Sequence, residues 1–185
     1  KEEEAYVYNF LGMLGLPLVP TEQIDMNADA AFFPIHILKD PTYKEKLEKF
    51  LSDGKPVLIT DGLASQLENL DQYDNLQILN VEGNPRDILR LSRAEVNEMR
   101  NKMLKPLGLS FDAPTMVSLY LMGEDLIVIE NFKDEAVSVT LETEFSLKPK
   151  VELVLPSSET VGKEFNDHKL EFSNLPPRTL VAISY

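Results

Sequence analysis

The sequence contains no cysteine and no tryptophan, and its only histidines are His36 and His168. Without a thiol, the chain forms no disulfide and offers no cysteine nucleophile, iron–sulfur ligand or cysteine-based zinc ligand. The absence of disulfides fits the cytosol, but it also fits many periplasmic and surface proteins of bacteria. The redox compartment stays open, and we favour a periplasmic or extracellular location over the cytoplasm.

Long apolar runs are also missing. No stretch reaches the roughly 18–20 uninterrupted apolar residues that a membrane helix needs, so we expect no membrane span. The first residues, Lys1-Glu2-Glu3-Glu4, do not resemble a signal peptide, because no apolar segment follows a basic start.

Positive charge is scarce as well. The 185 residues include 18 Lys and Arg against 31 Asp and Glu, which gives a formal net charge of −13. This balance argues against binding to nucleic acid and to anionic membrane surfaces. Apolar residues make up 43% of the chain, which is typical of a folded globular protein rather than a disordered one.

The first part of the chain alternates between helical and strand patterns. The continuous apolar run Val57-Leu58-Ile59-Thr60 is typical of a parallel strand covered on both faces. Ser92 and Glu95 form the pattern of a capping box that begins a helix. We expect helices over residues 2–14, 42–51, 63–70 and 92–104, and strands over residues 18–19, 30–35, 57–60 and 76–81.

After residue 115 the helical patterns end and short alternating segments follow. They predict strands over residues 117–121, 126–129, 137–141, 151–155, 170–172 and 180–185, with a tight turn at Gly123-Glu124. The predicted fold class is therefore α/β followed by all-β. It comprises a flavodoxin-like or class I amidotransferase-like parallel sheet with helices, then a small antiparallel β-sandwich. The predicted domains are residues 1–112 and 113–185.

The order of elements at the start is unusual for this class, since a doubly wound α/β domain usually opens with a strand and this chain opens with a helix. We expect that a first strand, and with it a preceding domain, lies upstream of Lys1.

Several segments resemble a known family. They are residues 14–21 (LGLPLVPT), Phe33-Pro34, residues 38–41 (LKDP), residues 54–62 (GKPVLITDG), and, in the β part, residues 129–132 (IENF) and 175–181 (LPPRTLV). Together they are similar to the amidotransferase-like domain, and the small β domain after it, of multidomain glycoside hydrolases of the β-galactosidase type. In that family a catalytic (β/α)₈ barrel precedes these two domains. The resemblance covers most of the chain, and its motifs are structural.

The departures from the family limit what the resemblance implies. Amidotransferases use a cysteine nucleophile, which this chain lacks. The glycosidase carboxylates of the family lie on the barrel, and a barrel needs about 250 residues. No catalytic residue of the family can therefore be carried over, and the catalytic activity of this chain alone stays uncertain, with none expected.

Three residues are candidates for ligand binding. His36 follows one expected strand, and Asp61-Gly62 follows another, so both lie near the carboxyl edge of a parallel sheet, where ligands usually bind. His36 could act as an acid or base, and Asp61 could bind a sugar hydroxyl or a metal ion. The simpler interpretations are a loop histidine and a turn with a helix cap, and we favour them.

Other candidates are weaker. His168 lies in a segment of turn composition and is expected to be exposed. Acidic pairs such as Glu124-Asp125 lack the spacing of a calcium loop. Tyr120 is the one aromatic side chain of the β part that we single out as a sugar platform, and a single exposed aromatic is ordinary. We predict no cofactor and no metal site.

The sequence thus predicts a non-catalytic accessory region of a glycoside hydrolase-like, carbohydrate-active bacterial protein. It would pack against a catalytic barrel or mediate subunit contacts, so its partners would be a preceding catalytic domain or another copy of the chain. The alternative is an independent small-molecule or sugar-binding module, with carbohydrate as its ligand and the pocket near His36 and Asp61. A stand-alone hydrolase that uses carboxylates is the third hypothesis.

Overall fold

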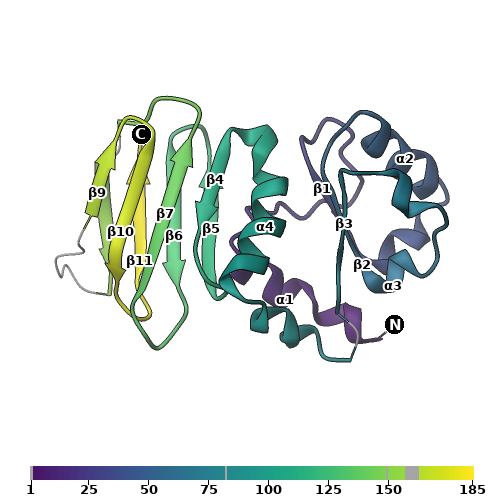
Figure 1. Cartoon of the computed structure of the whole chain (residues 1–185), viewed down its shortest axis with the longest axis horizontal. Helices are drawn as coiled ribbons and strands as arrows, with labels where there is room; N and C mark the ends of the chain where they lie inside the picture. The colour runs from purple at the N-terminus through teal and green to yellow at the C-terminus, as the bar shows by residue number, and fades with distance from the viewer. Residues whose placement is uncertain (1, 82, 149, 157–162) are drawn as a thin grey trace. The chain divides into compact units, whose positions relative to one another are not determined.

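The structure is a computed structural model that describes residues 2–81, 83–148, 150–156 and 163–185. The chain forms two compact units, each made from two segments. The first unit comprises Lys1–Phe10 and Val19–Arg90, and the second comprises Leu11–Leu18 and Leu91–Tyr185. The first contains a parallel sheet with helices and the second contains antiparallel sheets (Figure 1). This arrangement agrees with the predicted order of α/β followed by β.

The N-terminal helix is broken into short pieces. The 3₁₀ helix η1 (Glu2–Tyr6) leads into α1 (Tyr8–Leu11), and the 3₁₀ helix η2 (Gly12–Leu14) follows. The sequence predicted one continuous helix over residues 2–14. The region is helical, but the prediction of a single helix is wrong because the structure has three short helices there. Gly15 ends this region in the left-handed conformation, with φ of 71°, as its role as a C-cap predicts.

The parallel sheet has three strands in the order β1-β2-β3, namely β1 (Ala31–Phe33), β2 (Val57–Thr60) and β3 (Leu76–Leu79). Strand β2 is central, and all four of its residues are buried, so the prediction from its apolar run is confirmed. No strand forms over residues 18–19, although the structure describes both. Pro17 and Pro20 flank this dipeptide and cannot donate to a ladder, and the Leu18 N–H donates to the nearby Leu16 carbonyl at 2.9 Å.

Helices surround this sheet. The amphipathic helix α2 (Tyr43–Ser52) buries Leu47, Phe50 and Leu51 against β2. The short helix α3 (Asp61–Ala64) begins directly after β2, so the expected turn at Asp61-Gly62 is instead the first turn of a helix. The remaining helices of the unit are the 3₁₀ helices η3 (Ile35–Lys39), η4 (Leu70–Gln72) and η5 (Pro85–Arg90).

The second unit begins with α4 (Arg93–Leu104), and the capping box predicted from the sequence is confirmed. The Ser92 hydroxyl accepts from the Glu95 N–H at 3.3 Å, and the Glu95 carboxylate accepts from the Ser92 N–H at 2.7 Å. The 3₁₀ helix η6 (Lys105–Leu107) and Gly108 then end the helical segment.

Two antiparallel sheets follow, and together they form one apolar core. The first sheet has the order β4-β7-β10-β9 and the second has the order β5-β6-β11-β8. Their strands are β4 (Leu109–Asp112), β5 (Val117–Met122), β6 (Leu126–Asn131), β7 (Val137–Thr143), β8 (Lys150–Leu155), β9 (Lys163–Asn166), β10 (Lys169–Leu175) and β11 (Leu180–Ser184). Strands β4 and β9 were not expected from the sequence. Strand β4 ends at Asp112, the last residue of the first predicted domain, and it pairs with β7, which belongs to the second predicted domain. The predicted boundary at residue 112 stays a prediction.

A buried arginine fastens the second unit together. Arg100 on α4 is 0% exposed, and its guanidinium donates to the carbonyls of Leu14 at 2.8 Å, Phe111 at 2.9 Å and Ala113 at 2.8 Å. Burial lowers the pKa of Arg100 to about 10. Gly15 is needed beside it, because a Cβ there would lie 2.7 Å from Nη1 of Arg100. The segment Leu11–Leu18 is thereby held against α4 and β4.

Candidate functional site at the carboxyl edge of the parallel sheet

A buried carboxylate occupies the carboxyl edge of the parallel sheet. Glu4 on η1 is only 2% exposed, and its Oε2 accepts from the Ile35 N–H at 2.9 Å and from the Thr60 hydroxyl at 2.6 Å. Ile35 begins η3 just after β1, and Thr60 is the last residue of β2. One carboxylate therefore joins the ends of two adjacent strands to the N-terminal segment.

Thr60 has two roles at this edge. Its hydroxyl donates to Glu4, and the same oxygen accepts from the Leu63 N–H at 3.3 Å as the N-cap of α3. A hydroxyl can do both because it has one donor and two lone pairs. The cap of α3 and the position of Glu4 are therefore linked through a single side chain.

Gly62 makes room for this carboxylate. It lies in α3, and an added Cβ would come within 1.7 Å of Glu4 Oε1 and 2.9 Å of its carboxyl carbon. No real Cβ approaches another atom so closely, so the sequence requires glycine here for space.

Asp61, the second candidate from the sequence, has a structural contact. Its Oδ1 accepts from the Val81 N–H at 2.9 Å, which ties the segment after β3 to the start of α3. The side chain is half-buried. The carboxylate is therefore placed at the expected edge, and one of its oxygens is engaged by backbone.

His36, the remaining candidate, lies on η3 one residue after Ile35 and is half-buried. The helices η3 and α3 are in contact, so His36 belongs to the same edge of the sheet as Asp61 and Gly62. Whether these three residues bind a ligand stays a prediction.

Glu4 is the residue of this edge that the sequence interpretation missed. From the sequence, Glu4 falls with Glu2 and Glu3 in the first turn of the expected helix, where the helix dipole favours negative charge. The spacing of residues along the chain could have predicted its burial. Glu4 lies on one helical stripe with three apolar residues that are all buried, namely Val7, Leu11 and Leu14. A carboxylate on an apolar stripe needs buried donors, and Thr60 supplies one of them.

The burial of Glu4 limits the chemistry that its carboxylate can perform, because a substrate cannot reach it. A general acid or base must reach the proton that it transfers in the substrate. Glu4 is almost completely covered, and its Oε2 already accepts two hydrogen bonds. The geometry is therefore that of a structural contact, in which Glu4 covers the carboxyl edge of the sheet through its hydrogen bonds from Ile35 and Thr60. Among the described residues, no group of three or more His, Asp or Glu side chains could hold a metal ion.

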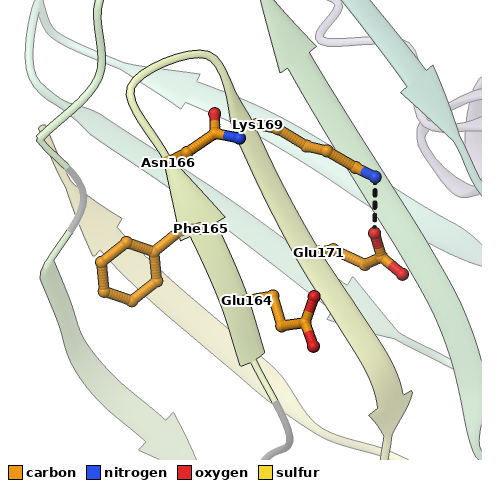
Figure 2. Close-up of a pocket in the computed structure, with 5 residues that line it drawn as sticks. All are labelled: Glu164, Phe165, Asn166, Lys169 and Glu171. Carbon is orange, nitrogen blue, oxygen red and sulfur yellow. Dashed lines mark ion pairs between the residues drawn. The ribbon is translucent and has the colours of Figure 1, made fainter.

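A shallow hollow of about 210 Å³ lies on the hairpin of β9 and β10 in the second unit. It is lined by Glu164, Phe165, Asn166, Lys169 and Glu171. Lys169 Nζ lies 2.7 Å from Glu171 Oε2, and this hydrogen bond raises the pKa of Lys169. In Figure 2 the Phe165 ring points away from that ion pair, so the hollow lacks an aromatic platform facing its polar groups.

His168, at the turn between β9 and β10, is exposed as expected. Its ring Nδ1 lies 3.1 Å from the Phe145 carbonyl and 3.2 Å from the Thr143 carbonyl. These contacts give it a structural role in the turn. In the described part of the chain, no helix is both long and apolar enough to span a membrane.

Comparison with known proteins gives little. No family model matches the chain, and no curated protein matches it. Among solved structures, it is similar to the apo exo-carrageenase GH42 from Bacteroides ovatus, with a TM-score of 0.34 and 13% sequence identity. That similarity covers 99% of this chain and 26% of the enzyme, so the chain spans about a quarter of the enzyme's length. A TM-score this low assigns neither fold nor function.

Proposed function

We propose that the chain is a non-catalytic accessory region of a carbohydrate-active, glycoside hydrolase-like bacterial protein. Its α/β part would be amidotransferase-like, and it would pack against a catalytic barrel or mediate subunit contacts. The resemblance of its motifs to the post-barrel domains of β-galactosidase-type enzymes supports this role.

The observation that carries the proposal is the closed carboxyl edge of the parallel sheet. In open α/β sheets, ligands bind outside the carboxyl ends of the strands. Here Glu4, from the chain's own N-terminal segment, occupies that position and hydrogen-bonds to Ile35 and Thr60. An edge filled by its own chain suits a scaffolding role better than catalysis or ligand binding.

The test is the complete coding sequence of the gene. We expect it to encode a barrel-sized domain before Lys1, with two carboxylates about 5–10 Å apart at the mouth of the barrel. The complete protein should hydrolyse glycosides, and the present chain alone should not. A complete gene without such a domain would overturn the proposal.

A further inference from the structure

The second antiparallel sheet, β5-β6-β11-β8, has a mostly apolar outer face. Because side chains alternate along a strand, the register of each ladder shows which residues share a face. The apolar residues of this outer face that are at least partly exposed are Tyr120, Met122, Leu126, Leu155, Leu180 and Ala182. We call this set the apolar sheet face. Met122 and Leu155 are its most open members, at 49% and 47% exposed, and Val128 lies among them and is buried.

An apolar outer face is unusual for an antiparallel sheet, which commonly has one face on the core and one polar face in water. The outer face of the first sheet follows that rule and carries Glu142, Lys169 and Glu171. Contiguous apolar surface marks sites of contact with another protein. The chain itself covers one corner of the second sheet, where the Ser118 hydroxyl donates to the Gly12 carbonyl at 2.7 Å.

Two opposite charges flank the apolar sheet face. Glu130 on β6 lies opposite Leu180 of β11, and Lys150 on β8 lies opposite Ser184 of β11. Burial raises the pKa of Glu130, because partial removal from water disfavours its charged form. Lys150 is exposed, and its ammonium has three N–H donors, so it can bond to a carboxylate of another chain in addition to contacts within its own.

The two charges cannot pair with each other within one chain. They are two strands and four residues apart on the sheet, which corresponds to about 17 Å. Ala182 lies halfway between them, because β11 is the strand between β6 and β8 and Ala182 is midway between Leu180 and Ser184.

This placement makes the face complementary to itself. Consider two copies packed face to face, with a two-fold axis that passes over Ala182 at right angles to the line from Glu130 to Lys150. Glu130 of each copy then lies opposite Lys150 of the other. Such reciprocity is the property of a two-fold interface, in which the same patch serves both subunits.

The same axis brings the most exposed apolar side chains together. With strands about 4.8 Å apart and a rise of about 3.4 Å per residue, the axis also passes over Met122 and close to Leu155. Each of these side chains would meet its own copy. The strands of the two sheets would cross at about 70°, near the orthogonal class of sheet packing, with the small Ala182 at the crossing point.

The other negative charges oppose this pairing only weakly. Glu124 and Asp125, in the turn that follows Met122, are exposed and would lie at the rim of the interface. Each copy has a net charge of −13, but at physiological ionic strength the Debye length is about 8 Å, so charges outside the interface are largely screened.

We propose that the apolar sheet face binds a second copy of the chain across a two-fold axis over Ala182, with two reciprocal ion pairs between Glu130 and Lys150. This inference rests on the part of the proposed function that assigns subunit contacts, and it does not require a catalytic barrel.

The first test is sedimentation equilibrium at physiological ionic strength. We expect the natural chain to form dimers that dissociate on dilution, because a face four short strands wide is at the small end of stable interfaces. Glu130→Lys and Lys150→Glu should each weaken the dimer at least about tenfold, because like charges then face each other. Glu164→Lys makes the same charge change on the first sheet and should leave the dimer intact.

A mixture of the two single variants gives the sharper result. In a mixed dimer of Glu130→Lys with Lys150→Glu, a lysine faces a glutamate at both positions. The equimolar mixture should therefore associate as the natural chain does, although neither variant does so alone. Circular dichroism of each variant checks that its fold is retained.

The second test leaves the charges unchanged and uses the natural absence of cysteine. Met122→Cys is compared with Phe165→Cys, since both side chains are 49% exposed and Phe165 lies on β9 in the first sheet. Facing sheets lie about 10 Å apart, so a short bismaleimide can join two copies of residue 122. We expect a cross-linked dimer from Met122→Cys and a monomer from Phe165→Cys.

The outcomes separate this surface from the accessory role. A natural chain that is still monomeric at about 100 µM overturns the surface and leaves the test by the complete gene unaffected. Dimers that persist in both single variants, a mixture that fails to associate, or equal cross-linking at the two positions would also overturn it. If the isolated chain is monomeric but residue 122 is shielded from N-ethylmaleimide in the complete gene product, the occupant is another domain and the second copy is wrong. The predicted dimer in a gene product without a barrel would uphold the surface and overturn the accessory role.

Discussion

Replacing Gly62 with alanine tests whether the hydrogen-bonded Glu4 carboxylate stabilises the carboxyl edge of the parallel sheet. The new Cβ would lie 1.7 Å from Glu4 Oε1, so the carboxylate must move. Its movement would break the hydrogen bonds from the Ile35 N–H and the Thr60 hydroxyl. Alanine has an intrinsic advantage of about 1 kcal/mol over glycine in a helix, so a loss of stability would have to come from this contact.

The magnitude follows from the groups involved. A buried donor left without a partner costs about 1–3 kcal/mol, and forcing extra volume into a packed site costs about 1–3 kcal/mol. With partial relaxation of Glu4, we expect Gly62→Ala to lower the free energy of unfolding by about 3 kcal/mol.

The assay is urea unfolding followed by circular dichroism, with amide hydrogen exchange of β2 to assign the change to the first unit. Gly12→Ala is the matched control, because its added Cβ would meet no atom within 4 Å. It should be neutral or slightly stabilising. In a double-mutant cycle, Glu4→Ala should remove most of the penalty of Gly62→Ala. If Gly62→Ala changes the free energy of unfolding by less than about 0.5 kcal/mol, or shows no coupling to Glu4→Ala, then Glu4 does not stabilise this edge as described.

Three further predictions concern other parts of the fold. Arg100→Met should lower the free energy of unfolding, measured by urea titration, by about 3–5 kcal/mol, because it leaves three buried carbonyls without a donor. The stability of Arg100→Lys should lie between that of Arg100→Met and that of the natural protein. An unchanged stability of Arg100→Met would contradict the stabilising role of these hydrogen bonds. The pKa of Asp40 is lowered to about 2, chiefly by the hydrogen bond from Lys46, so its contribution to stability is present above pH 3.8 and is lost as the pH falls through 2. A carboxyl-detected NMR titration should show this value, and Lys46→Ala should raise it toward 3.8, whereas an identical titration in the variant would contradict the assignment. Ser92→Ala should cost about 1 kcal/mol by removing the capping box of α4, measured by thermal unfolding, and no change would mean that the cap contributes nothing.

Local patterns predicted the elements that depend on local physics. The run Val57–Thr60 is a buried central strand because a parallel strand covered on both faces must be apolar throughout. The capping box at Ser92 begins a helix because its two hydrogen bonds form within one turn. The alternating strands of the β part were likewise visible in the sequence.

The missed elements depend on distant partners. Strand β4 follows a helix directly and spans only Leu109–Asp112, and it is defined by pairing with β7, about thirty residues later in the chain. Strand β9 carries one large apolar residue, Phe165, and forms by pairing with β10. Intrinsic preferences of four residues cannot reveal such pairings.

The candidate site shows the same limit. The sequence placed His36, Asp61 and Gly62 near the carboxyl edge of the sheet, because strands that run in parallel end on one side. It did not place Glu4 there, since the hydrogen bond from Thr60 joins residues 56 positions apart. The need for glycine at position 62 also became clear only when this carboxylate was located.

The measurement that tests the closed sheet edge most directly is an NMR titration of the isolated chain with galactose and with lactose. If Glu4 closes the edge, the amide signals of Ile35–Lys39 and Asp61–Ala64 should not shift with either sugar. Saturable shifts confined to those two segments would contradict the account, and they would favour a sugar-binding module with His36 and Asp61 in its pocket.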